Sequence, residues 1–103
     1  MDYKVVWSPE AVDDVDSIAT YIARDSEFYA AAVVDKILDA TRKLALFPEA
    51  GRVVPELGDD SIREQFIYSY RLIYRIKGNR VTIAAVIHGK QQFSPFAYRV
   101  KNI

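Results

Sequence analysis

The sequence predicts one α+β domain spanning residues 1–103, in which two antiparallel helices pack on one face of an antiparallel sheet. Three observations predict this class. A short β-branched and aromatic run opens the chain, two stretches of helical apolar periodicity follow it, and three strand-like segments close it, with Gly78-Asn79 as a hairpin turn. The predicted order is therefore β-α-α-β-β-β.

The first strand is predicted at Tyr3 to Trp7, because this run is rich in residues that favour strands and ends at Ser8-Pro9. Ser8 is a good helix N-cap, and Pro9 fits the first helical position, where its missing N–H costs nothing. The buried stripe of the first helix consists of apolar side chains at helical spacing: Ala11, Val15, Ile18 and Ile22.

A second helix follows after a short connection, with Asp25 or Ser26 as its N-cap. Pro48 ends its periodicity, and its stripe comprises Ala30, Val33, Ile37, Ala40, Leu44 and Phe47. The acidic residues of the first helix, namely Asp13, Asp14 and Asp16, are expected on its solvent side. Adjacent helix positions do not converge on one ion, so no metal site is predicted from them. Residues 49–60 are predicted to form a loop.

Three strands are predicted at residues 62–66, 70–76 and 80–88. With a two-residue turn at Gly78-Asn79, Lys77 lies opposite Arg80, Tyr74 opposite Ile83, and Arg71 opposite Val86. Alternation then sorts the side chains onto two faces. The face predicted to lie under the helices carries Tyr70, Leu72, Tyr74, Ile76, Val81, Ile83, Ala85 and Ile87. The open face carries Arg71, Ile73, Arg75, Lys77, Arg80, Thr82, Ala84, Val86 and His88.

This open face is predicted to be basic and to carry the function. A three-residue connection at 67–69 would point Ile62 and Phe66 toward the helices and set Gln65 opposite Arg71. The register set by the Gly78-Asn79 turn makes Arg71 and His88 diagonal neighbours on this face. The surface predicted from this register contains Arg63, Arg71, Arg75 and His88.

The distribution of charge supports a basic surface, although the formal net charge is zero. Residues 1–60 hold 13 acidic and 6 basic residues, whereas residues 61–103 hold only Glu64 against 8 basic residues. This asymmetry favours an acidic peptide or a nucleic acid as partner, although blocks of like charge also occur as plain solvated surface. The chain has no cysteine, no apolar run of membrane-spanning length and no phosphate-binding loop, so we expect a cytoplasmic protein without cofactor.

Several segments, in this order along the chain, resemble the RelE/ParE superfamily of toxins from bacterial type II toxin–antitoxin modules. They are Trp7-Ser8-Pro9-Glu10-Ala11, Phe47-Pro48-Glu49-Ala50-Gly51-Arg52, Ile62-Arg63-Glu64, Tyr70-Arg71-Leu72-Ile73-Tyr74-Arg75-Ile76 and Val86-Ile87-His88-Gly89. The resemblance implies the fold predicted above, and it implies a toxin–antitoxin hetero-oligomer in which a disordered antitoxin segment folds around the toxin. It also implies growth inhibition and a role in plasmid stabilisation.

The resemblance leaves the target open between DNA gyrase, as for ParE-like members, and the ribosome with its mRNA, as for RelE-like endoribonucleases. In a nuclease, Arg71 would match the strand arginine that contacts phosphate, and His88 would be the acid or base. However, Gly89-Lys90-Gln91-Gln92-Phe93 lacks the tyrosine or His-Tyr ending of many such nucleases. We therefore expect a ParE-like gyrase inhibitor neutralised by a cognate antitoxin, with a nuclease and a toxin-like fold without toxicity as alternatives.

The candidate residues for binding the target or the antitoxin are the basic ones of the predicted surface and its flanks: Arg52, Arg63, Arg71, Arg75, His88 and Lys90. Structural roles remain open for them. His88 could be a hydrogen-bonded residue at a strand end, and Arg71 could simply pair with Glu64 or Glu49.

Overall fold

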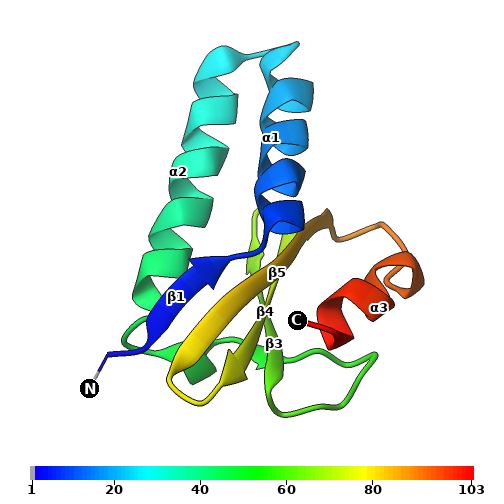
Figure 1. Ribbon diagram of the computed structural model, residues 1–103. Helices are drawn as coiled ribbons and strands as arrows, with labels where there is room; N and C mark the ends of the chain where they lie inside the picture. Colours follow the sequence, from blue (N-terminus) through cyan, green and yellow to red (C-terminus); the bar gives the residue numbers. More distant parts are fainter. Residues whose placement is uncertain (1) are drawn as a thin grey trace.

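A computed structural model describes residues 2–103 and contains five strands, three α-helices and one 3-10 turn (Figure 1). The elements are β1 (Lys4–Trp7), α1 (Pro9–Ala23), α2 (Glu27–Lys43), η1 (Pro48–Ala50), β2 (Arg52–Val53), β3 (Ile62–Ile67), β4 (Tyr70–Lys77), β5 (Arg80–His88) and α3 (Ser94–Lys101). Within this part of the chain, no helix is long and apolar enough to cross a membrane.

The predicted α+β fold is confirmed, with α1 and α2 forming an antiparallel hairpin against one face of the sheet (Figure 1). The strand order is β1-β5-β4-β3-β2. The sheet is mixed rather than wholly antiparallel, because β1 pairs with β5 in the parallel direction while the other pairs are antiparallel. Strand β1 is therefore an edge strand, and its neighbour is β5, the last strand in the sequence.

Both helices begin where the sequence predicts. The Oγ of Ser8 accepts a hydrogen bond from the Ala11 N–H at 3.1 Å, and the Oγ of Ser26 accepts one from the Tyr29 N–H at 3.0 Å. Helix α2 ends at Lys43, whereas the predicted apolar stripe continues to Phe47. Phe47 therefore lies beyond the helix and is 65% exposed, so its assignment to the buried stripe was wrong.

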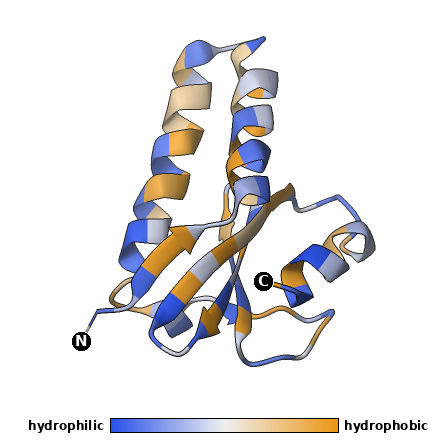
Figure 2. Ribbon diagram, viewed as in Figure 1, coloured by the Kyte–Doolittle hydropathy of each residue, from blue (hydrophilic) through white to orange (hydrophobic). Residues whose placement is uncertain are grey.

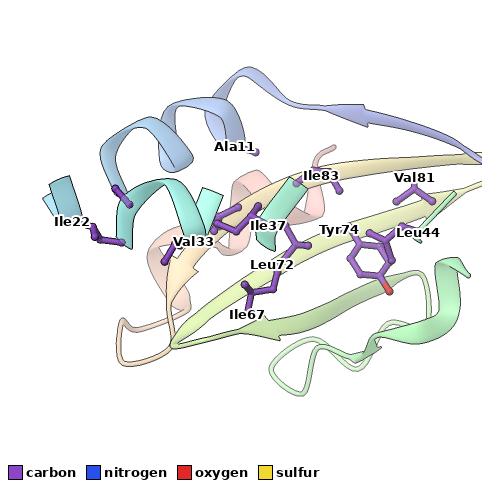
Figure 3. Packing of buried hydrophobic residues seen from close by; sticks show 12 residues of the cluster. Ala11, Ile22, Val33, Ile37, Leu44, Ile67, Leu72, Tyr74, Val81 and Ile83 are labelled. Atoms are coloured by element: carbon purple, nitrogen blue, oxygen red, sulfur yellow. The ribbon is translucent and has the colours of Figure 1, made fainter. Parts of the chain in front are cut away.

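The main core lies between the helical hairpin and the sheet (Figure 3). Figure 2 shows hydrophilic and hydrophobic residues alternating along α1 and α2, as expected for helices that bury one side only. The buried side chains that meet in this core include Ala11, Val33, Ile37, Leu44, Leu72, Tyr74, Val81 and Ile83. The hairpin turn is as predicted, since Lys77 pairs with Arg80, Tyr74 pairs with Ile83, and Gly78 has a φ of 61°.

A β-bulge in β5 changes the register beyond the turn. Ile73 pairs with Ala85 whereas Tyr74 pairs with Ile83, so β5 contains one residue more than β4 at this point. Arg71 consequently lies opposite Ile87, and the predicted pairing with Val86 was wrong. The extra residue also reverses the faces of the end of β5. Val86 joins the core under α1 and α2, while Ala85 and Ile87 join the opposite face.

The register predicted for β3 was also wrong, because the β3–β4 turn contains two residues rather than three. Ile67 pairs with Tyr70, Phe66 pairs with Arg71, and Tyr68 adopts a φ of 53° in the turn. Ile62 and Phe66 therefore point away from α1 and α2, and Arg63 and Gln65 lie on the face of these helices. The prediction assumed that only one face of the sheet could receive an apolar side chain such as Ile62.

A second core covers the face that the sequence left open. The unpredicted helix α3 and residues 54–57 pack there, around Val54, Ile62, Ile73, Ala84, Ala85, Ile87, Phe93 and Val100. Asp14, predicted to lie in solvent, accepts hydrogen bonds from the Val86 N–H at 2.9 Å and from Arg99 of α3 at 2.5 Å. The sheet thus lies between two helical layers.

Tyr74 fixes the segment after α2 to the sheet. Its hydroxyl group donates to the Pro48 carbonyl at 2.7 Å and accepts from the Gly51 N–H at 2.9 Å. Burial raises the pKa of Tyr74, so its hydroxyl stays protonated and able to donate. Gly51 has no room for a side chain, because a Cβ would lie 2.5 Å from the Glu64 carbonyl oxygen.

We expect Tyr74→Phe to lower the free energy of unfolding by about 1–3 kcal/mol, because it leaves a buried N–H and a buried carbonyl without their partner. Urea unfolding followed by circular dichroism measures this change. Tyr98→Phe is the matched control, since Tyr98 is an exposed residue of α3. Equal stability of the two variants would contradict the anchoring role of Tyr74.

Candidate functional site

Arg71, the predicted functional arginine, is buried and fully engaged by carboxylates. It is 5% exposed on β4, and its Nε donates to Glu64 at 2.6 Å. Its Nη1 and Nη2 donate to the two carboxylate oxygens of Glu56 at 2.9 and 2.8 Å. The guanidinium carbon also lies 5.4 Å from the centre of the Phe93 ring. Of the two partners weighed from the sequence, Glu64 is confirmed and Glu49 was wrong.

Glu64 joins Arg71 to Arg52 in one network, which we name the arginine–glutamate cluster: Arg52, Glu56, Glu64 and Arg71. The side chain of Glu64 has no exposed surface, and it accepts from Arg52 Nε at 2.7 Å as well as from Arg71. Arg52 itself is largely exposed and stacks on the Phe66 ring at 5.3 Å. A buried carboxylate is tolerable here because two guanidinium groups hydrogen-bond to it.

Hydrogen bonding favours the charged forms of Glu56 and Arg71. The hydrogen bond from Arg71 lowers the pKa of Glu56, and the hydrogen bond to Glu56 in turn raises the pKa of Arg71. Each group thus stabilises the charged form of the other. Arg71 links β4 to β3 through Glu64 and to the loop through Glu56. Its hydrogen-bond donors are therefore already occupied by these carboxylates.

His88 lies on the opposite face of the sheet from Arg71. It pairs with Tyr70 across the strands, and the two rings meet edge to face with their centres 5.4 Å apart. Its Nδ1 accepts a hydrogen bond from the Lys90 N–H at 3.1 Å. The imidazole lines a hollow of about 270 Å³ together with four tyrosines: Tyr21, Tyr29, Tyr68 and Tyr70. The predicted diagonal contact of Arg71 with His88 was therefore wrong, and the bulge in β5 is the reason.

The other predicted site residues are also dispersed, so the predicted common surface does not exist. Arg63 lies on the face of α1 and α2 and donates to the carbonyls of Asp60 and Gly51 at 3.1 and 3.0 Å. Arg75 lies on the face of α3 and donates to the Lys101 carbonyl at 2.8 Å. Lys90 is exposed in the turn after β5. Among the candidate side chains, Arg52 and Arg71 meet through Glu64, and His88 contacts the main chain of Lys90.

A groove that the sequence did not predict runs between α2 and β3, with a volume of about 640 Å³. Three exposed aromatic side chains line it, namely Phe47, Phe66 and Tyr68, together with the basic residues Lys36, Lys43 and Arg52. We name it the α2–β3 groove. In β2 only Arg52 and Val53 pair with β3, which leaves Gln65 to Ile67 without a strand on that edge. In the sequence, the sign of this groove was the pair of aromatic residues Phe66 and Tyr68 at the turn that follows the predicted strand at residues 62–66.

Comparison with known protein families gives one decisive match. Residues 5–93 match the family model of the ParE toxin of the type II toxin–antitoxin system parDE. The chain belongs to the ParE toxin family. The match covers most of the chain, including α1, α2, β2 to β5 and all of β1 except Lys4, so the resemblance seen in the sequence segments is confirmed for this ParE toxin homologue. No curated protein matches the chain significantly.

Solved structures share the fold of this ParE family member. A chain of the chromosomal ParDE system from P. aeruginosa has a TM-score of 0.68 at 19% identity, with 84% of this chain and 95% of that chain covered. A chain of the RelBE2 toxin–antitoxin complex from Mycobacterium tuberculosis has a TM-score of 0.59 at 25% identity, with 85% and 99% covered. A YoeB dimer from Staphylococcus aureus has a TM-score of 0.58 at 16% identity, with 85% and 98% covered.

We expect the Arg71–Glu56 pair to make stability pH-dependent. Because the pKa of Glu56 is lowered from 4.5 in the folded protein, its contribution is complete above that value and is lost as the pH falls through the folded pKa. Glu56→Gln should therefore lower stability at neutral pH and lose less stability than the wild type on acidification. Urea unfolding at neutral and acidic pH measures both effects.

Glu49→Gln serves as the control for this comparison, since the Glu49 carboxylate is exposed and lies 3.9 Å from Arg63. This variant should follow the wild-type pH dependence. If Glu56→Gln and Glu49→Gln respond alike to acidification, the Arg71–Glu56 pair does not contribute to acid sensitivity.

Proposed function

We propose that this ParE family member is a growth-inhibiting toxin that acts by binding DNA gyrase and is neutralised by a cognate antitoxin. Membership of the ParE family supports a toxin of a type II toxin–antitoxin system. The choice of gyrase over the ribosome is our own inference. It depends on where Arg71 and His88 lie and on the partners that Arg71 already has.

The observation that carries the proposal is the separation of these two residues, together with the pairing of Arg71 with two carboxylates. Metal-free RNA cleavage needs an acid or base and a phosphate-binding cation at one site. Here the guanidinium of Arg71 is already bound by Glu56 and Glu64, and His88 lies on the other face of the sheet. His88 is the only histidine in the chain. This arrangement favours inhibition by occupying a macromolecular target.

The α2–β3 groove is our proposed site for the antitoxin. Its exposed aromatic rings can anchor apolar side chains, and its basic rim suits a segment that also carries acidic residues. The open edge of β3 at Gln65 to Ile67 can accept an added strand. Similar folds occur in solved toxin–antitoxin complexes, including RelBE2 of Mycobacterium tuberculosis and YoeB–YefM of Staphylococcus aureus, which supports an antitoxin partner for this chain.

We expect the purified toxin to inhibit DNA supercoiling by gyrase in vitro, and its expression without antitoxin to cause filamentation and SOS induction. His88→Ala should leave both effects intact, because His88 contributes no catalytic step to binding. The measurements are a supercoiling assay on plasmid DNA, cell length, and an SOS reporter.

Three outcomes would contradict the proposal. Rapid loss of translation with cleaved mRNA, abolished by His88→Ala, would instead support an endoribonuclease. Unaffected supercoiling would exclude gyrase as the target, and unimpaired growth with soluble, folded protein would indicate a toxin-like fold without toxicity.

For the antitoxin site, we expect Phe47→Ala to weaken antitoxin binding at least about tenfold, because Phe47 is an exposed ring of the groove and an aromatic anchor of an interface commonly contributes more than 1 kcal/mol. Titration calorimetry with the cognate antitoxin measures the affinity. Phe28→Ala is the matched control, since Phe28 is an exposed phenylalanine near the start of α2 and outside the groove. Equal effects of the two substitutions would place the antitoxin elsewhere.

A further inference from the structure

A group of unpaired basic side chains gathers where the β4–β5 turn meets the start of β1. Lys4, Arg80 and Lys77 are direct neighbours across β1, β5 and β4 in register, so they form one row on the face of α3. Arg75 lies two residues before Lys77 on that face, and its Nη1 donates to the carbonyl of Lys101. We name the four basic side chains on this face the basic tip: Lys4, Arg75, Lys77 and Arg80.

A shallow hollow of about 390 Å³ opens within the basic tip. Its lining consists of Arg75, Lys77, Asn79, Arg80, Thr82 and Ile103. All of these side chains except that of Ile103 can donate a hydrogen bond, and Arg75 Nη1 also donates to the main-chain oxygen of Ile103 at 3.4 Å. The Nε of Arg75 is buried and has no hydrogen-bond partner.

No Asp or Glu side chain of residues 2–103 forms an ion pair with the basic tip. The cations that form ion pairs in this part of the chain are Arg42, Lys43, Arg52, Arg63, Arg71 and Arg99, and none of these belongs to the tip. Asp59 lies close enough to Arg75 to be influenced by its charge, but its carboxylate accepts from the N–H and hydroxyl of Ser61 at 2.9 and 2.7 Å.

Folding does not explain this arrangement. Like charges directly opposite one another in a sheet are destabilising, and here three stand in a row. A lysine on an edge strand can protect the edge from aggregation, which explains Lys4 on β1. Lys77 and Arg80 lie on internal strands, where no edge needs protection. Their charges are therefore available for a partner.

We propose that the basic tip binds the phosphodiester backbone of a nucleic-acid duplex. Arginine and lysine side chains are the usual donors to phosphate oxygens. None of the large exposed apolar side chains lines the hollow, whereas an acidic peptide would need an apolar anchor and single strands would need aromatic rings for stacking. This inference is independent of the proposed action on gyrase.

The test is fluorescence anisotropy of the purified chain with labelled duplex DNA and, in a second arm, duplex RNA of the same sequence. The logarithm of the binding constant should fall linearly with the logarithm of the salt concentration, by about 0.9 per phosphate contact. Lys77→Gln with Arg80→Gln should weaken binding about tenfold or more at low salt and reduce the slope by about 2. The arm with the higher affinity identifies the source of the phosphates.

Arg24→Gln with Lys90→Gln is the matched control, because it removes one arginine and one lysine charge from exposed positions outside both the tip and the α2–β3 groove. It should keep the wild-type slope. Urea unfolding should show that the tip variant is at least as stable as the wild type, since it relieves repulsion between like charges. Absence of salt-dependent binding, equal loss in both double variants, or equally tight binding of labelled polyglutamate would each overturn the proposal.

Discussion

Strand β5 is apolar on both of its faces, and most of the structure depends on this constraint. Every residue from Val81 to Ile87 except Thr82 is buried. A strand of this kind needs cover on both sides, because exposed apolar surface costs about 25 cal/mol per Å². The hairpin of α1 and α2 supplies one layer, and α3 with residues 54–57 supplies the other. The bulge in β5 divides the apolar residues between these layers, with Ile83 and Val86 facing one and Ala85 and Ile87 facing the other.

The layer formed by α3 and residues 54–57 gives Arg71 a structural role in place of the phosphate-binding role suggested by the sequence. On an open sheet this arginine would be free to meet a phosphate group, whereas beneath α3 it needs carboxylate partners, since an unpaired charge in such a position is strongly unfavourable. Glu64 from the neighbouring strand and Glu56 from the loop provide them. The same residue that suggests chemistry in the sequence therefore holds β4, β3 and the loop together, which is consistent with the proposed action by binding.

The charge asymmetry of the sequence has two different outcomes in the fold. Part of it is neutralised internally, because Arg71 pairs with Glu56 and Arg99 with Asp14, so basic residues of the second half meet acidic residues of the first. Another part stays without an ion pair, because Arg75, Lys77 and Arg80 gather at the basic tip. The α2–β3 groove with its aromatic rings and the basic tip are chemically distinct surfaces, and the proposed antitoxin and the proposed nucleic-acid duplex accordingly use different parts of the molecule.

The sequence by itself determined the α+β class, the order of β1, α1, α2, β3, β4 and β5, the N-cap at Ser8, the Gly78 turn and the family resemblance, whereas η1 and β2 lie in a segment predicted to be a loop. The features that the sequence determined depend on interactions between residues close in sequence, which periodicity and turn chemistry reveal. The tertiary structure decided the faces of His88 and Ile62, the burial of Arg71 and the presence of α3. A single bulged residue or a turn shorter by one residue inverts every side chain beyond it. Such a change depends on which apolar layer receives Ile62 and Ile87, and that layer is formed by residues distant in the sequence.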